Sequence, residues 1–192
     1  MTCIGVDVGG TNIACGLVNG DGQITTKIIE PTNKFGPYNI MDNIIDICKR
    51  LTKVEHIKSI GVGFPGEVDS CEGIVNNCPN IQFKNINVKQ ILESEFNVGV
   101  KIENDANCAA WAEYLFGSAK NTKISVTITI GTGIGGGVII DGNIYKGMNG
   151  GGTEFGHMII HLNGNVCGCG RRGCWETYAS TSALINETKK AS

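Results

Sequence analysis

The chain has 192 residues, enough for one large domain or two small ones with a buried core. A formal net charge of −2 and a pI near 5.9 argue against a nucleic-acid partner, because phosphate backbones attract basic surfaces. Most of the nine cysteines are scattered without paired spacing, which indicates reduced thiols and a cytoplasmic location. No apolar run is long enough for a membrane-spanning helix, so we expect no membrane partner.

The first elements form a meander around a glycine turn. Residues 2–8 predict a buried strand that follows Met1 at once, without a targeting leader, and residues 13–18 and 23–29 predict two further strands. The turn at residues 9–12 aims backbone N–H groups outward in an anion nest suited to phosphate, and Asp7 is placed to act on Mg²⁺. An ordinary hairpin turn explains the same glycines about equally well.

Helix-like and strand-like segments then alternate. The expected elements are a helix over 37–51, a strand over 57–63, a helix over 87–96, a strand over 98–103 and a helix that begins near 104–107. Between the second strand and the second helix, the sequence predicts a turn at Pro65 and Gly66 and a loop at 78–81. Asp105 is a candidate N-cap of the last helix, and Asn104 could cap it as well.

A polar stretch at 117–123 predicts a hinge, which divides the chain into domains at 1–117 and 118–192. After it, the strands 123–130 and 138–145 flank a second glycine turn at 131–137. A strand follows this turn where a dinucleotide-binding fold needs a helix. The unit instead echoes the hairpin at Asp7, which suggests two related domains that each present a phosphate-binding turn to a shared cleft. A final helix is expected over 174–190.

A zinc site is predicted near the end of the chain. His157, Cys167, Cys169 and Cys174 offer one imidazole and three thiolates, the ligand set of closed structural zinc sites. A disulfide or a set of unrelated buried thiols is the alternative, which the close spacing of the cysteines makes less favourable. Two carboxylates, Glu154 and Glu176, bracket this cluster and are candidates to bind polyol hydroxyls.

Five motifs occur in a fixed order, namely AspValGlyGlyThr, GluAsnAspAlaAsn, GlyThrGlyIleGlyGlyGly, GluPheGlyHis and CysGlyCysGlyArgArgGlyCysTrpGlu. With them the chain resembles the ROK family (repressors, open reading frames and kinases), most closely its bacterial glucokinases. The resemblance implies an α/β chain with the actin-like ATPase (ribonuclease H-like) fold, in which two α/β domains surround a cleft. It also implies ATP-dependent phosphorylation of a hexose, most simply glucose, with Mg²⁺ and a structural Zn²⁺.

The resemblance assigns roles to individual residues. Asp105 matches the family's catalytic base. The sugar contacts that it implies are Gly66, Asn80, Asn104, Asp105, Glu154, His157 and Glu176. The phosphate-binding residues that it implies are Asp7, Gly9, Gly10, Thr11, Asn12, Gly131, Thr132, Gly133, Gly135 and Gly136. We also expect a homo-oligomer, namely a dimer.

The same motifs are compatible with other functions within the family. An N-acetylmannosamine or N-acetylglucosamine kinase has nearly the same motifs, and a truncated, non-catalytic sugar-binding ROK protein is a third reading. The family's repressors carry an N-terminal helix-turn-helix segment, for which the few residues before Asp7 leave no room. Glu67 replaces a proline that is common in relatives, with a role that the sequence does not define. Because relatives continue past Ser192 with an adenine-binding segment, we expect an incomplete second domain.

Overall fold

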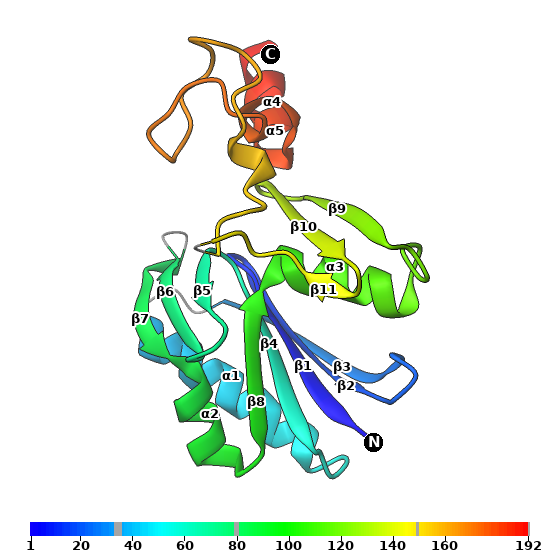
Figure 1. Ribbon diagram of the computed structural model, residues 1–192. Helices are drawn as coiled ribbons and strands as arrows, with labels where there is room; N and C mark the ends of the chain where they lie inside the picture. Colours follow the sequence, from blue (N-terminus) through cyan, green and yellow to red (C-terminus); the bar gives the residue numbers. More distant parts are fainter. Residues whose placement is uncertain (33–35, 79–80, 149, 192) are drawn as a thin grey trace. The chain divides into compact units, whose positions relative to one another are not determined.

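The computed structural model describes residues 1–32, 36–78, 81–148 and 150–191, which Figure 1 shows as a ribbon. The chain divides into two compact units, residues 1–108 and 109–192. This division falls inside helix α3 (Asp105–Phe116), whereas the boundary proposed from the sequence lies just after the end of the same helix. Within the described residues, no helix has both the length and the apolar character needed to cross a membrane.

A mixed sheet of five strands forms the centre of the first unit. Its strands are β1 (Cys3–Val8), β2 (Asn12–Val18), β3 (Ile24–Pro31), β4 (Ser59–Phe64) and β8 (Gly99–Asn104), in the order β3-β2-β1-β4-β8. The first three strands form the expected antiparallel meander, whereas β1, β4 and β8 run parallel. Because parallel strands share one carboxyl edge, Asp7 and the segments after Phe64 and Asn104 meet at the same end of the sheet.

Two helices cover one face of this sheet with an apolar stripe. Helix α1 (Pro37–Thr52) buries residues at helical spacing, from Ile40 to Leu51, and α2 (Val88–Phe96) buries Val88 and Leu92. They pack with alternate strand residues in one continuous core. Each fully buried Ile, Leu or Phe side chain contributes on the order of 1.5–3 kcal/mol to folding. The unit therefore has a core of its own beneath the edge that carries Asp7.

A second, smaller sheet lies in the segment where the sequence predicted only a turn and a loop. It contains β5 (Glu67–Asp69), β6 (Ile74–Cys78) and β7 (Phe83–Asn87), all antiparallel, in the order β5-β6-β7. These strands are short and carry several asparagines, so they show little of the alternation that marks a strand. Packing stabilises them instead, as in the contact of the Phe64 and Phe83 rings with centroids 4.9 Å apart.

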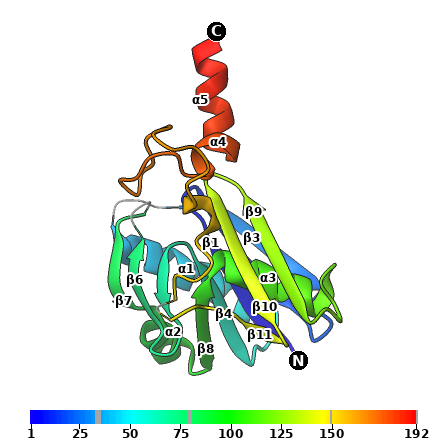
Figure 2. The ribbon, with the colours of Figure 1, turned by 45° about the horizontal axis from the view of Figure 1, so that its top comes forward.

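The second unit begins within α3 and contains the hairpin of β9 (Ile124–Ile130) and β10 (Ile134–Ile140), which run side by side in Figure 2. A two-residue turn then leads to β11 (Asn143–Ile144). The two turn residues, Asp141 and Gly142, have φ angles of 46° and 74°, as a type I′ hairpin turn requires. The single strand expected over 138–145 is therefore interrupted by this turn.

The end of the chain contains a 3₁₀ turn, η2 (Phe155–His157), and two helices, α4 (Glu176–Ala179) and α5 (Thr181–Ala191). The sequence predicted one helix over 174–190, and this prediction is wrong at Ser180. Ser180 has extended backbone angles, and its hydroxyl accepts a hydrogen bond of 3.1 Å from the Ala183 amide. Ser180 therefore ends α4 and caps the start of α5.

Candidate functional site

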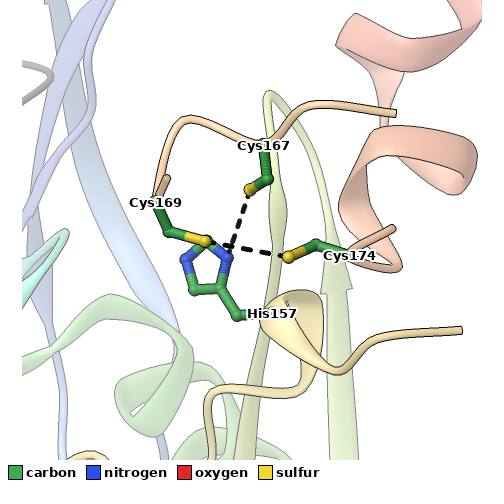
Figure 3. A group of neighbouring side chains, drawn as sticks. All are labelled: His157, Cys167, Cys169 and Cys174. Carbon is green, nitrogen blue, oxygen red and sulfur yellow. Dashed lines mark hydrogen bonds between the residues drawn. The ribbon is translucent and has the colours of Figure 1, made fainter. Parts of the chain in front are cut away.

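The four predicted metal ligands come together in the second unit. Their ligand atoms, one imidazole nitrogen and three sulfurs, all lie within 4.8 Å of one another. Figure 3 shows the four side chains directed toward one another. His157 ends the η2 turn, Cys167 and Cys169 lie on the following loop, and Cys174 lies two residues before the start of α4. The loop reverses sharply at Gly173, which has a φ of 79° and where a Cβ would lie 1.8 Å from the His161 carbonyl oxygen. Only glycine fits this position.

The spacing of these atoms fits a tetrahedral metal ion. Bond lengths of about 2.3 Å for Zn–S and about 2.05 Å for Zn–N imply tetrahedral edges of about 3.8 Å between sulfurs and about 3.6 Å between sulfur and nitrogen. The Sγ atoms of Cys169 and Cys174 are 3.7 Å apart, and the Sγ atom of Cys167 is 3.6 Å from Nδ1 of His157. The four side chains can therefore hold a zinc ion with little rearrangement.

The three thiols differ in their acidity in the metal-free chain. Burial is the main reason that the pKa of Cys167 is raised to about 12, and burial also raises the pKa of Cys174. Cys169 is exposed, and hydrogen bonds from the backbone and then the side chain of Arg171 help to lower its pKa to about 6. Cys169 is therefore the most readily ionised ligand of the cluster.

Glu176 connects the metal cluster to the second glycine turn. Its Oε1 accepts a hydrogen bond of 2.9 Å from the Cys167 thiol and lies 3.4 Å from Nδ1 of His157. A Cβ at Gly133 would lie 2.7 Å from the other carboxylate oxygen, so a larger residue there would displace the Glu176 carboxylate. Glu154 is exposed at the start of η2, and its carbonyl oxygen accepts a hydrogen bond from the His157 amide.

Gly131, Thr132 and Gly133 join β9 to β10, so a strand follows the turn, as the sequence predicted. The turn expected over 131–137 is too long, because Gly135, Gly136 and Gly137 belong to β10 and pair with β9. The Gly131 amide donates to the Gly133 carbonyl at 3.0 Å, and the Thr181 amide at the start of α5 donates to the Gly131 carbonyl at 2.9 Å. A Cβ at Gly136 would lie 2.2 Å from the Phe155 ring. The turn is therefore fixed between α5 and the segment that carries His157.

The first glycine turn lies at the carboxyl edge of the sheet in the first unit. The Gly9 amide donates to the Asn12 carbonyl at 2.9 Å, and the Thr32 hydroxyl donates to the Gly9 carbonyl at 2.7 Å. Sequence reasoning missed Thr32, a buried residue that follows β3 and braces the turn. Partial burial raises the pKa of the Asp7 carboxyl, and the positive charge of Lys27 opposes this rise.

The first turn of α3 resolves which residue caps the helix. The side-chain oxygen of Asn104 accepts hydrogen bonds from the amides of Ala106, at 3.0 Å, and Asn107, at 3.1 Å. Asn104 also donates to the Gly66 carbonyl at 3.2 Å. Gly66 has a φ of 88°, and a Cβ there would lie 2.4 Å from the Asn77 carbonyl oxygen. Asn104 is thus the N-cap, and Asp105 is the first residue of the helix.

Glu103 was not singled out in the sequence, although it holds this edge together. Its carboxylate accepts hydrogen bonds from the Ser70 hydroxyl at 2.9 Å, the Asn104 amide at 3.0 Å and the Asn107 side chain at 3.1 Å. It thereby ties the end of β5 to the first turn of α3. The spacing of Ser70 and Glu103 in the sequence gives no hint of this contact.

The structure thus groups the proposed site residues within each unit. Asp7, the first glycine turn, Gly66, Asn104 and Asp105 belong to the first unit. The second glycine turn, Glu154, Glu176 and the metal cluster belong to the second. Asn80, an expected sugar contact, lies outside the described residues. Glu67 accepts a hydrogen bond of 3.3 Å from the Asn76 side chain at the β5–β6 pair.

The chain is similar to known proteins along almost its whole length. The model of the ROK family matches residues 3–192. The glucokinase of Streptomyces coelicolor is 41% identical over 189 residues, which cover 97% of this chain and 59% of that protein. The xylose repressor of Bacillus subtilis is 38% identical over 187 residues, which cover 95% of this chain and 48% of the repressor.

A solved structure is also similar along almost the whole chain. A ROK family glucokinase from Streptomyces griseus, in complex with glucose and AMPPNP, superimposes with a TM-score of 0.91 at 38% identity. The match covers 99% of this chain and 61% of that one. The chain therefore spans about three fifths of the length of these glucokinases and about half that of the repressor.

Proposed function

Since the chain belongs to the ROK family and has its actin-like ATPase fold, we propose that it acts in the ATP-dependent phosphorylation of a hexose, with glucose as the substrate. The match to about three fifths of the solved glucokinase agrees with a second domain that is incomplete. The identities to glucokinases favour a kinase, although the family also contains the xylose repressors. The argument for catalysis therefore rests on the site residues and not on the fold.

The observation that carries the proposal is the division of labour between Asn104 and Asp105. Asn104 caps α3 and binds the Gly66 carbonyl, whereas Asp105 accepts a hydrogen bond from the Ala106 amide, which Asn104 accepts as well. In the proposed reaction, the Asp105 carboxylate accepts the proton of the sugar hydroxyl that attacks the γ-phosphate of ATP. The hydrogen bonds of Glu103 and of the Gly66 carbonyl fix the start of α3 against the segment around Gly66, which is expected to contact the sugar.

The two glycine turns supply the expected phosphate contacts. In each turn, backbone N–H groups can approach phosphate oxygens without a side chain in the way. Gly10 and Gly131 have open space where a Cβ would lie, which is consistent with close approach of a ligand. Asp7 offers the hard carboxylate oxygen that Mg²⁺ prefers, and the ion would neutralise charge on the phosphates.

The metal cluster would act through structure and not through chemistry. A closed shell of three sulfurs and one nitrogen leaves no open position on zinc for substrate. With Nδ1 of His157 directed at the cluster, its Nε2 remains as a hydrogen-bonding group for a sugar hydroxyl. Glu154 and Glu176 would add charge-assisted hydrogen bonds to hydroxyls in the same unit.

A coupled assay of ADP release tests the proposed reaction. The purified chain, with ATP and Mg²⁺, is offered glucose, N-acetylmannosamine and N-acetylglucosamine in parallel. We expect the highest kcat/KM with glucose. A clear preference for either N-acetylated sugar would assign the chain to an amino-sugar kinase, and the absence of ADP release with every sugar would contradict the proposal.

Metal analysis tests the proposed zinc site separately. We expect about one zinc per chain after washing with a weak chelator, and none in a Cys167→Ser, Cys169→Ser double variant. Cys71→Ser is the matched control, because this exposed thiol lies in the first unit. Equal zinc content in the double variant and the parent would show that the ion is held elsewhere.

A further inference from the structure

The loop that carries the cysteines has an inner and an outer part. The metal loop, residues 158–174, is closed at its base by a β-bridge between Ile159 and Cys174 and further out by a bridge between Val166 and Arg172. Cys167 and Cys169 lie on the outer part, beyond the second bridge. Two of the four metal ligands therefore depend on how the outer part is held against the rest of the unit.

Tyr178, on α4, holds the inner part of the loop directly next to the second bridge, from which the outer part projects. Its hydroxyl accepts a hydrogen bond of 2.8 Å from the Asn165 amide and lies 3.2 Å from Nδ1 of His161. The Tyr and His rings also meet edge to face, with centroids 6.0 Å apart. The Asn165 side chain donates a further hydrogen bond of 3.2 Å to the Thr177 carbonyl. We call the contacts of Tyr178 with Asn165 and His161 the Tyr178 latch.

The latch uses both hydrogen-bonding capacities of the hydroxyl. Its oxygen accepts from Asn165, and its proton can be donated to His161 when that ring carries its own proton on Nε2. The space around the hydroxyl is closed by Gly164, where a Cβ would lie 1.9 Å from the hydroxyl oxygen. A larger residue at this position would push the ring away. None of these contacts involves a metal ligand.

We propose that Tyr178 is a positioning residue for the metal site, because its latch fixes the residues next to the second bridge and so keeps the outer part of the loop in a metal-binding shape before any metal binds. The inference deepens the proposed zinc role and rests on it. The apparent dissociation constant of a site equals its intrinsic constant divided by the fraction of molecules in the competent conformation. A residue that raises this fraction strengthens metal binding without touching the ion.

The first test is zinc affinity, measured by competition with a chromophoric chelator. Tyr178→Phe keeps the ring and removes the hydroxyl, and we expect the zinc dissociation constant to rise about tenfold. Tyr145→Phe makes the same chemical change elsewhere in the second unit and should stay within about twofold of the parent. Spectra of the cobalt-loaded parent and Tyr178→Phe proteins should coincide, because the four ligands are unchanged.

A steric pair of variants tests the latch without altering Tyr178. Gly164→Ala should reproduce the affinity loss, because its methyl group would occupy the place of the hydroxyl. Gly168→Ala lies on the same loop, has no atom within 4 Å of the added methyl group and should bind zinc like the parent. Equal affinities for the two alanine variants would contradict the proposal.

Amide hydrogen exchange in the zinc-free chain tests the Tyr178 latch independently of zinc binding. We expect the Asn165 amide to be protected in the parent and unprotected in Tyr178→Phe, while the amides of β10 exchange alike in both. If the parent binds no zinc but its Asn165 amide is protected, the proposed zinc site is wrong and the Tyr178 latch is still supported. An Asn165 amide that exchanges freely in the parent, or an unchanged zinc affinity in Tyr178→Phe, would overturn the positioning role.

Discussion

Replacing Asn104 by alanine should destabilise the first unit, because this one side chain makes three hydrogen bonds. Two cap the start of α3, through the amides of Ala106 and Asn107, and the third binds the Gly66 carbonyl. Loss of an N-cap costs about 1 kcal/mol, and loss of the bond to Gly66 costs about 1 kcal/mol more. We therefore expect a decrease of about 2 kcal/mol in the free energy of unfolding.

Two further variants separate the cap from its neighbour. Asn104→Asp keeps an oxygen for the cap but loses the donor to Gly66, so it should cost about 1 kcal/mol. Asp105→Asn should change stability by less than about 0.5 kcal/mol, because the new amide oxygen can still accept from the Ala106 amide, which Asn104 also accepts. The order of the three variants follows from the hydrogen bonds alone.

The assay is urea unfolding followed by the fluorescence of Trp111, which lies on α3. A Trp175→Phe background removes the second of the chain's two tryptophans, so the signal reports on α3. An Asn104→Ala midpoint equal to that of the parent, or an Asp105→Asn variant less stable than Asn104→Ala, would refute the assignment of Asn104 as the cap.

Two further predictions concern the second unit. In the zinc-free chain at pH 7, iodoacetamide should modify Cys169 before Cys167. A pKa of about 6 leaves Cys169 largely as the reactive thiolate, whereas a pKa of about 12 keeps Cys167 protonated. Mass spectrometry of digests gives the order of modification, and equal rates at the two cysteines would contradict these acidities. Gly136→Ala should lower the free energy of unfolding by about 1–3 kcal/mol, because the added methyl group would meet the Phe155 ring. Gly131→Ala is the control, because its methyl group meets no atom within 4 Å. Equal melting temperatures for the two variants would rule out this clash.

Much of the first unit could be predicted from its sequence, because its elements have strong local patterns. The apolar residues of α1 recur at helical spacing, and Pro37 opens the helix, so the expected helix at 37–51 is confirmed with one more residue at its end. The meander at Asp7 is confirmed for the same reason. The strands β5, β6 and β7 could not be predicted, since their stability depends on packing and pairing along short polar segments.

In the second unit, the cysteine spacing predicted a cluster that the structure brings together. In the first unit, the sequence could not decide whether Asn104 or Asp105 caps α3, because either side chain can accept hydrogen bonds from the same backbone amides. Nor could it find Glu103 and Tyr178, whose partners lie at a distance in the sequence. The break at Ser180 was hidden because residues on both sides favour a helix, and only the backbone angles show it.

The central claim, that Asp105 is the catalytic base of a hexose kinase, is tested most directly by phosphoryl transfer. The purified chain and its Asp105→Asn variant are incubated with glucose, ATP and Mg²⁺, and glucose phosphate is quantified. We predict slow product formation by the parent, because the chain spans only about three fifths of the glucokinase it matches, and a rate at least about a hundredfold lower with the variant, because the amide cannot take the proton. Product formation by the variant at the parental rate would contradict the claim, as would a parent that forms no phosphorylated hexose.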